Sequence, residues 1–319
     1  MIGKETVSVI IPCFREFETI LGVVSTLPDF VDHIIVVDDG CPEGTGRLVQ
    51  DNVRDKRLTV LFHESNQGVG AAMITGYSWV LKNTDSDLIV KVDGDGQMDP
   101  ARLKTLLEPL ANGSADYAKG NRFSSLEDLE AMPKIRILGN AVLSLLSKFS
   151  SGYWNVTDPT NGYTAITRST LERIKLQKLN RGYFFESDML FRLSVVGAVV
   201  VDVSMPSIYG SERSHLNIRR VIWQFPRRHT ANLLKRIFYN YYLREWNVAS
   251  IELPLGLLLF FGGVGLGIIS WSAASAAGLP ATSGQVMLAS VPMILGFQLI
   301  LAFISYDVSA TPKPRFGAR

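Results

Sequence analysis

Three polar residues alternate with two glycines directly after an apolar run, in the order Asp93, Gly94, Asp95, Gly96 and Gln97. Carboxylate and amide oxygens are the ligands that Mg²⁺ and Mn²⁺ prefer. If the chain stays extended there, the three polar side chains point to one side, and the glycines leave room for a ligand near the backbone. The pattern predicts a divalent metal site that binds phosphates, with a ligand-free Asp-Gly turn as the alternative.

Apolar runs of strand length recur along the chain, and segments with helical spacing separate most of them. We predict strands at residues 7–12, 33–37, 58–63, 88–92, 115–121 and 198–203. We predict helices at residues 18–27, 44–55, 68–81, 101–111, 134–150 and 184–193. This alternation predicts an α/β fold with a mostly parallel central sheet covered on both faces. Ligands of such sheets bind beyond the carboxyl ends of the strands.

Polar residues also follow the first two predicted strands. Phe14 and Glu16 come after the first, where an aromatic ring and a carboxylate could hold a nucleobase by packing and by accepting base N–H groups. Asp38 and Asp39 end the second and could bind a base or a ribose. A turn that caps the following helix is the alternative for this pair.

Two later segments carry weaker signals. Gly68 and Gly70 open a helix after a strand, but Met73 stands where a dinucleotide fingerprint has its third glycine, so a Rossmann site is disfavoured. These glycines still allow a ligand to approach closely. Glu186 and Asp188 could accept hydrogen bonds from sugar hydroxyls, and acids favoured by the helix dipole are the alternative.

The composition says little about which soluble molecules the protein binds. The 319 residues carry a net charge of +2, which does not indicate a nucleic-acid partner. Hydrophobic residues make up 47% of the chain, and the mean hydropathy is +0.16. The two cysteines, Cys13 and Cys41, lack metal-ligand spacing and fit a reducing compartment.

The hydrophobic excess is concentrated near the C-terminus. Basic and aromatic residues are interleaved from 217 to 246, which suits a membrane surface, with nucleic acid as the alternative. No charged residue occurs from Leu253 to Tyr306, which favours the membrane. The apolar runs at 251–271 and 286–306 are each roughly 20 residues long, enough to cross a bilayer. Two core helices of a soluble protein are the alternative.

Basic residues lie before the first apolar run and after the second, which places both ends in the cytoplasm by the positive-inside rule. We therefore predict an integral protein of the plasma or inner membrane. Its predicted parts are a cytoplasmic catalytic domain at 1–215, amphipathic juxtamembrane helices at 216–248, a transmembrane hairpin at 249–308 and a basic cytoplasmic tail at 309–319.

Four motifs in this order resemble those of a family 2 glycosyltransferase of GT-A fold. They are Val-Ser-Val-Ile-Ile-Pro-Cys-Phe-Arg-Glu at 7–16, Val-Val-Asp-Asp-Gly at 36–40, Asn-Gln-Gly-Val-Gly-Ala-Ala at 66–72 and Asp-Gly-Asp-Gly-Gln at 93–97. With the C-terminal apolar pair, the chain resembles polyprenyl-phosphate glycosyltransferases of the dolichyl-phosphate mannose synthase type. The resemblance implies inverting sugar transfer from GDP-mannose or a UDP-sugar to dolichyl or undecaprenyl phosphate, with Mg²⁺ or Mn²⁺.

The resemblance also implies roles by position. The residues that would frame the nucleotide are Pro12, Phe14, Glu16 and Asp39. Those that would carry the metal, and through it the diphosphate, are Asp93, Asp95 and Gln97. Those that would meet the acceptor phosphate are Arg122 and Arg136. The pair near the diphosphate would be Arg213 and Ser214. Those on the sugar and acceptor side would be Asn161, Glu186 and Asp188.

The chain departs from the usual family pattern in places. Phe14 and Arg15 replace a usual Tyr-Asn pair, Cys41 replaces a serine, and Val69 replaces a basic residue. These changes leave the predicted fold intact but leave the base and the sugar open.

Two other functions and the oligomeric state also stay open. A processive polysaccharide synthase would need more membrane spans and a Gln-X-X-Arg-Trp motif, which we do not find. A membrane scaffold with a degenerate nucleotide-binding domain would not need a complete acidic turn. The sequence does not say whether the chain forms homo-oligomers.

Overall fold

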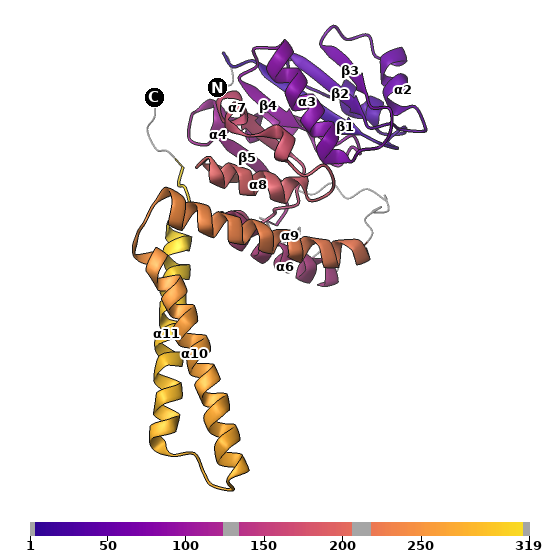
Figure 1. The fold of residues 1–319 in the computed structure, drawn as a ribbon. Helices are drawn as coiled ribbons and strands as arrows, with labels where there is room; N and C mark the ends of the chain where they lie inside the picture. The colour runs from indigo at the N-terminus through magenta and orange to yellow at the C-terminus, as the bar shows by residue number, and fades with distance from the viewer. Residues whose placement is uncertain (1–3, 124–133, 206–217, 315–319) are drawn as a thin grey trace. The chain divides into compact units, whose positions relative to one another are not determined.

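The chain forms an α/β fold, as predicted, followed by two long apolar helices (Figure 1). The computed structural model describes residues 4–123, 134–205 and 218–314, with the backbone alone at 134–136 and 218–222. Contacts divide the chain into one unit of residues 1–234 and 312–319 and another of residues 235–311. The predicted four-part division stays a prediction.

Seven strands form one sheet in the order β3-β2-β1-β4-β6-β5-β7. Their bounds are β1 (Val7–Cys13), β2 (His33–Asp38), β3 (Leu58–Phe62), β4 (Leu88–Lys91), β5 (Tyr117–Asn121), β6 (Thr164–Thr167) and β7 (Val200–Ser204). All six predicted strands are present. The unpredicted strand is β6, which runs antiparallel between β4 and β5, whereas the other neighbouring pairs are parallel. It has only four residues, two of them threonines, so it lacks an apolar run.

The central strands are buried on both faces, which explains their unbroken apolar runs. On β1, Val9 and Ile11 belong to one core and Ile10 to the other. The helices that cover the first core are α1 (Ile20–Ser25), α2 (Thr45–Asn52) and α4 (Leu103–Ala111). Those that cover the second are α3 (Val69–Asn83), α7 (Arg168–Arg173) and α8 (Phe185–Val195). Short 3₁₀ turns complete this unit at η1 (Pro100–Arg102) and η2 (Leu176–Lys178).

Two further helices meet below this sheet, namely α6 (Lys134–Ser151) and the first part of α9 (Ile218–Phe238) (Figure 1). The His229 ring on α9 bonds through Nδ1 to Ser150 Oγ on α6 at 2.7 Å. Phe225 packs edge-to-face on Phe184, beside α8, with ring centroids 5.3 Å apart. The part of α9 from Phe225 to Asn232 is therefore docked on the α/β fold by aromatic and polar contacts.

We expect this docking to weaken in mild acid through His229. Burial lowers the pKa of His229 to about 4, whereas the unfolded chain protonates near the ordinary value of about 6.5. The folded state therefore binds fewer protons, and its stability is lost as the pH falls below about 6.5. Between pH 7 and pH 5 the loss should be about 2 kcal/mol. Thermal unfolding of wild type and His229→Gln at both pH values checks this, since the variant should lose that part of the pH dependence. An equal pH dependence in the two proteins would contradict it.

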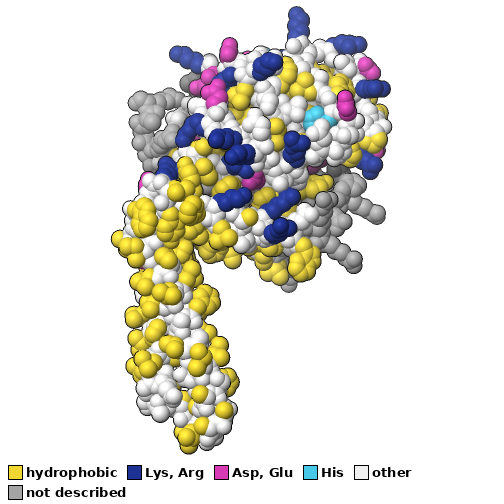
Figure 2. Space-filling view, viewed as in Figure 1, with side chains coloured by type: hydrophobic (Ala, Val, Ile, Leu, Met, Phe, Trp, Pro, Cys, Tyr) yellow, Lys and Arg dark blue, Asp and Glu magenta, His cyan; other side chains and the backbone are white. Residues whose placement is uncertain are grey.

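The second unit contains the end of α9, the π-helix η3 (Tyr239–Arg244), α10 (Val248–Ala276) and α11 (Ser283–Ser309). The last two contain the predicted apolar runs, and each is long and apolar enough to cross a membrane. Only 11% of each apolar window is buried, and Figure 2 shows apolar side chains along the surface of the two helices. A core helix of a soluble protein would be mostly buried, so this exposure favours the membrane alternative.

A buried ion pair joins distant parts of the second unit. Arg236, near the end of α9, donates two hydrogen bonds to Asp307 on α11, at 2.6 and 3.0 Å. The Tyr241 hydroxyl donates to the same carboxylate at 2.6 Å. All three side chains are buried, and buried charges need such partners. The cluster therefore fixes the end of α11 against η3.

Candidate active site

Two of the predicted motifs meet where β1 and β4 end. Thr19 Oγ1 donates a hydrogen bond to the Gly94 carbonyl at 2.7 Å. The Glu16 carboxylate also lies against Gly94, where an added Cβ would be only 2.1 Å from Glu16 Oε2. A side chain at this position would displace the Glu16 carboxylate. Glu16 and the acidic turn share one end of the sheet, as the order of the strands predicts.

The acidic turn, residues 93–97, is not extended. The strand β4 ends at Lys91 and the chain then turns, with Gly96 in the left-handed region at φ +75°. The Gln97 N–H donates back to Asp95 Oδ1 at 2.9 Å. The condition for placing all three side chains on one side, an extended chain, is therefore not met, because the glycines bend the chain. Within the described residues, no three His, Cys, Asp or Glu side chains form a metal-binding group.

The oxygen donors of this turn nevertheless fit a hard divalent ion. Asp93 and Asp95 offer carboxylates and Gln97 an amide, and Mg²⁺ is commonly bound by one or two carboxylates together with substrate phosphates. An added Cβ at Gly162 would lie 2.2 Å from Asp93 Oδ2. The absence of a side chain at Gly162 therefore makes room for that oxygen, and the Asp93 side chain is still 26% exposed.

A buried lysine holds Asp93 through its other oxygen. Lys91 Nζ lies 2.9 Å from Asp93 Oδ1 and 2.8 Å from Glu186 Oε1, and its side chain is 2% exposed. Burial lowers the pKa of Lys91, but the charges of Asp93 and Glu186 raise it more, so the pKa lies above its ordinary value. The charged ammonium therefore links the end of β4 to the first turn of α8.

Glu186 faces the acidic turn, but Asp188 does not. Residues two apart on a helix point about 200° apart. Asp188 is buried, accepts the Asn180 backbone N–H at 3.0 Å and accepts from the Asn232 side chain at 3.2 Å. Asp188 therefore joins α8 to α9. Its carboxylate is occupied by these protein contacts, which disfavours the predicted contact with sugar hydroxyls.

The two aspartates at the end of β2 are buried and bind protein groups. Asp38 Oδ2 accepts the Gly46 N–H at 2.6 Å, at the start of α2. Asp39 accepts the Gly68 N–H at 2.7 Å and contacts the His63 ring at 2.7 Å. The capping alternative therefore describes Asp38, and Asp39 shapes the loop that leads into α3.

The glycines at the start of α3 make room for the backbone of residues 180–182. An added Cβ at Gly68 would lie 2.5 Å from the Arg181 carbonyl oxygen, and one at Gly70 would lie 2.1 Å from that of Asn180. The Ala71 N–H also donates to the Arg181 carbonyl at 3.0 Å. Residues 180–182 therefore occupy the space beside these glycines, where the sequence predicts the close approach of a ligand.

The end of the first motif borders an open depression. Pro12 is buried within β1, whereas Phe14 is half-buried and the Arg15 guanidinium lies 5.5 Å from its ring centroid. Arg15 has φ +63°, a left-handed conformation that is rare outside glycine. The depression, of about 530 Å³, is lined by Arg15, Glu16, Phe17, Glu18, Thr19 and Glu43. It offers an aromatic edge and a carboxylate beside the acidic turn.

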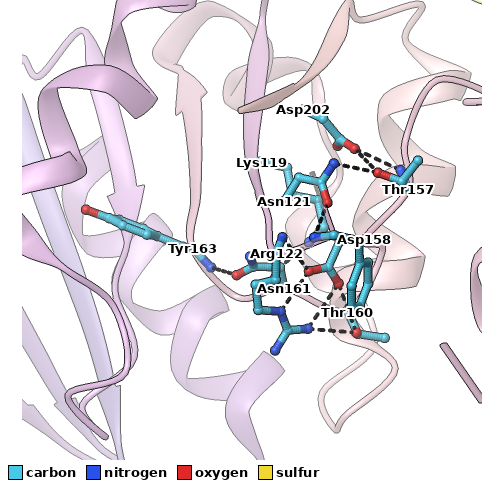
Figure 3. Close-up of polar contacts among 10 residues, drawn as sticks. Lys119, Asn121, Arg122, Thr157, Asp158, Thr160, Asn161, Tyr163 and Asp202 are labelled. Atoms are coloured by element: carbon cyan, nitrogen blue, oxygen red, sulfur yellow. Dashed lines mark hydrogen bonds and ion pairs between the residues drawn. The ribbon is translucent and has the colours of Figure 1, made fainter. Parts of the chain in front are cut away.

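Arg122 follows β5 and is held by a buried carboxylate (Figure 3). Its Nε and one terminal nitrogen donate to Asp158 at 2.7 and 3.0 Å, and Asp158 is fully buried. The same nitrogen reaches Thr160 Oγ1 at 3.4 Å. The Arg122 side chain is still 26% exposed. Asp158 therefore orients the guanidinium while leaving part of it at the surface.

A second buried lysine lies behind this ion pair. Lys119 on β5 is fully buried and donates to the Asn161 carbonyl, and burial lowers its pKa to about 8. The Asn161 side chain accepts the Tyr163 N–H at 2.9 Å and is buried (Figure 3). Asn161 therefore fixes the turn that leads to β6 and Gly162, rather than presenting its amide to solvent.

Sequence reasoning overlooked Lys91 and the partner of Arg122. A lysine inside an otherwise apolar strand, directly before the acidic turn, was the available signal for Lys91. Arg136 lies in the first turn of α6, and its side chain is outside the described residues. Arg213 and Ser214 also lie outside them.

Comparisons with known proteins place these features in a family. The model of glycosyl transferase family 2 matches residues 8–175. Polyprenol monophosphomannose synthase of Mycolicibacterium smegmatis is 32% identical over 225 residues, covering 68% of this chain and 84% of the relative. Undecaprenyl-phosphate mannosyltransferase of Micrococcus luteus is 33% identical over 198 residues, covering 61% and 80%.

A solved structure shares the fold. Glucosyl-3-phosphoglycerate synthase from Mycobacterium tuberculosis, in complex with Mn²⁺, uridine diphosphate and phosphoglyceric acid, has a TM-score of 0.55 at 20% identity. The similarity covers 73% of this chain and 78% of that one. The family match at residues 8–175 contains β2 to β6, nearly all of β1 and the acidic turn described above. This chain belongs to glycosyl transferase family 2.

Proposed function

We propose that the chain transfers a sugar from a nucleotide sugar to a polyprenyl phosphate, with inversion, at the cytoplasmic face of the membrane. The observation that carries the proposal is the acidic turn at the end of β4, packed against Glu16, in a family 2 chain with two candidate membrane spans. The relatives named above, which act on polyprenyl or undecaprenyl phosphate, support the acceptor class. GDP-mannose and a UDP-sugar remain the candidate donors, because a relative from Methanococcus voltae is a UDP-N-acetylglucosamine–dolichyl-phosphate transferase.

On the donor side, Asp93, Asp95 and Gln97 would hold Mg²⁺ or Mn²⁺. Such an ion would stabilise the negative charge that grows on the diphosphate as the sugar leaves. Glu16 lines the depression where the nucleobase would bind, and Phe14, two residues before it, would pack against the base. Pro12, Asp38 and Asp39 would act indirectly, by shaping the strand ends around the nucleotide.

On the acceptor side, an oxygen of the lipid phosphate bonds to the anomeric carbon as the bond to the nucleotide diphosphate breaks. A phosphate monoester is already anionic at pH 7, so it needs no strong general base. Arg122 and Arg136 would hold that phosphate, because a guanidinium matches its geometry. Arg213 and Ser214 would lie near the diphosphate, and Glu186 would meet the sugar.

The membrane would bring the lipid acceptor to this unit. The helix α6 exposes an apolar stripe at Leu138, Val142 and Leu145, each more than half exposed, and this spacing marks one helix face. The same helix begins with Lys134 and contains Arg136. A helix of this kind suits the lipid headgroup layer.

The charges around the two apolar helices predict how the chain is oriented in the membrane. A reporter fused after Arg319 should be active in the cytoplasm, and one inserted near Ala281 should be active on the other side. Paired cytoplasmic and external reporters measure this, with a fusion after Ser204, in the catalytic fold, as the cytoplasmic control. An external C-terminal reporter would mean that α10 or α11 does not cross.

The test of the function is a transfer assay. Membranes that contain the protein are incubated with radiolabelled GDP-mannose, UDP-glucose or UDP-N-acetylglucosamine and polyprenyl phosphate. We expect one mild-acid-labile lipid product, made only with divalent metal. A long polymer would favour a processive synthase, and nucleotide binding without transfer would favour a scaffold.

A further inference from the structure

The inference concerns the charge cluster of Lys91, Asp93 and Glu186. The Lys91 ammonium lies between the two carboxylates, at 2.9 and 2.8 Å. Glu186 comes 95 residues after Lys91, so the contact joins parts of the fold that are distant in sequence. On one side of the Lys91 ammonium lies Asp93, a predicted metal ligand, and on the other lies Glu186, which is proposed to contact the sugar.

Strand formation does not explain this lysine. Its neighbours Ile89, Val90 and Val92 are fully buried apolar residues, and an apolar side chain would serve β4 equally well. A buried ammonium costs several kcal/mol in desolvation unless carboxylates offset it. The two carboxylates are therefore the reason for a cation at this position.

We propose that Lys91 is a positioning residue that makes divalent-metal binding depend on the nucleotide diphosphate, an inference that rests on the proposed function. Lys91 holds Asp93 Oδ1 and opposes the approach of another cation to this carboxylate. A metal ion alone therefore meets a carboxylate that is already neutralised. A diphosphate adds oxygen ligands and negative charge, so the ion and the nucleotide bind together.

The test titrates Mn²⁺ by electron paramagnetic resonance into the full chain in detergent, without nucleotide and with GDP or UDP. In Lys91→Met, Mn²⁺ alone should bind about tenfold or more tightly, because the competing charge is gone. The additional gain from the nucleotide should shrink. In Glu186→Gln, Mn²⁺ alone should bind more weakly, because Lys91 keeps Asp93 as its one carboxylate partner in the cluster.

A matched control is available on β5, which β6 separates from β4 in the sheet. Lys119 is equally buried but donates to the backbone carbonyl of Asn161. Lys119→Met should change Mn²⁺ affinity in neither condition, although it also removes a buried ammonium. If Lys91→Met does not fold, Glu186→Gln still tests the proposal, because it nearly preserves the side-chain shape.

The outcomes separate this inference from the proposed function. Wild type that binds Mn²⁺ with GDP or UDP, together with unchanged affinities in Lys91→Met and Glu186→Gln, overturns the inference and leaves the proposed function standing. Tighter binding in one variant and weaker binding in the other supports it. Wild type that binds no Mn²⁺ with either nucleotide overturns the proposed metal site and this inference with it.

Discussion

Replacing Asp95 by alanine should lower the rate of sugar transfer at least about a thousandfold, because a metal held at the leaving diphosphate is worth several kcal/mol. The fold should survive. The Asp95 side chain is only partly buried, and the contact of its Oδ1 is with Gln97 in the same turn. EDTA should lower wild-type transfer by a similar factor, and added Mg²⁺ or Mn²⁺ should restore it.

Asp99 provides the matched control for this prediction. It lies four residues further along, is about as accessible, and its side chain accepts the Ala101 N–H at the start of η1. Asp99→Ala should cost about 0.5–2 kcal/mol of stability through the lost cap and keep transfer near the wild-type rate. Full activity of Asp95→Ala in EDTA would remove the metal from the proposed function.

Replacing Arg122 should have the second largest effect, and it should appear in two measurements. Arg122→Met should destabilise the protein by about 3–5 kcal/mol, because Asp158 is fully buried and loses its ion-pair partner. It should also weaken use of the lipid phosphate roughly ten- to a hundredfold. Nucleotide affinity, measured by calorimetry, should change much less.

A double variant separates these two effects. Arg122→Met with Asp158→Asn removes both charges, so much of the stability should return, while the dependence on lipid phosphate should stay impaired. Arg122→Lys should rescue the acceptor only in part, since an ammonium lacks the guanidinium fork. Recovery of normal lipid dependence in the double variant would show that Arg122 has only a structural role.

Arg168 provides the control for the loss of a partly exposed, ion-paired arginine as such. Its side chain is 25% exposed and pairs with Glu172 at 2.8 Å, at the other end of β4. Arg168→Met should alter stability without altering the dependence on lipid phosphate. A loss of nucleotide affinity in Arg122→Met, with normal lipid dependence, would move Arg122 to the donor side.

The sequence predicts the framework of the fold better than its details. Runs such as Val7–Cys13 are apolar because both sheet faces are buried, and that requirement is visible in sequence. The short strand β6 has no such run, so only its pairing with β4 and β5 identifies it. Helix ends differ by a few residues, since several helices lack a side-chain cap.

Part of the candidate site could likewise be predicted from the sequence, and part could not. The position of Asp93 and Asp95 after a strand follows from the order of elements, and Glu16 meets them because parallel strands end together. The partners of the buried charges cannot be predicted from the order of the elements. Lys91 reaches Glu186 through the packing of α8 on the sheet, which local sequence does not encode. Asp188 lies two residues from Glu186, and only the helix phase shows that it points elsewhere.

The ion pair between Arg236 and Asp307 has a consequence for biosynthesis. The two residues are 71 positions apart, so the pair cannot form until almost the whole chain has left the ribosome. If α10 and α11 cross the bilayer as proposed, Asp307 reaches Arg236 only after α10 has crossed and α11 has crossed back. Completion of the hairpin therefore precedes the final setting of the end of α9. A chain that stops at Tyr306 would retain nearly all of both proposed spans and still lack the ion pair that forms when they are correctly inserted.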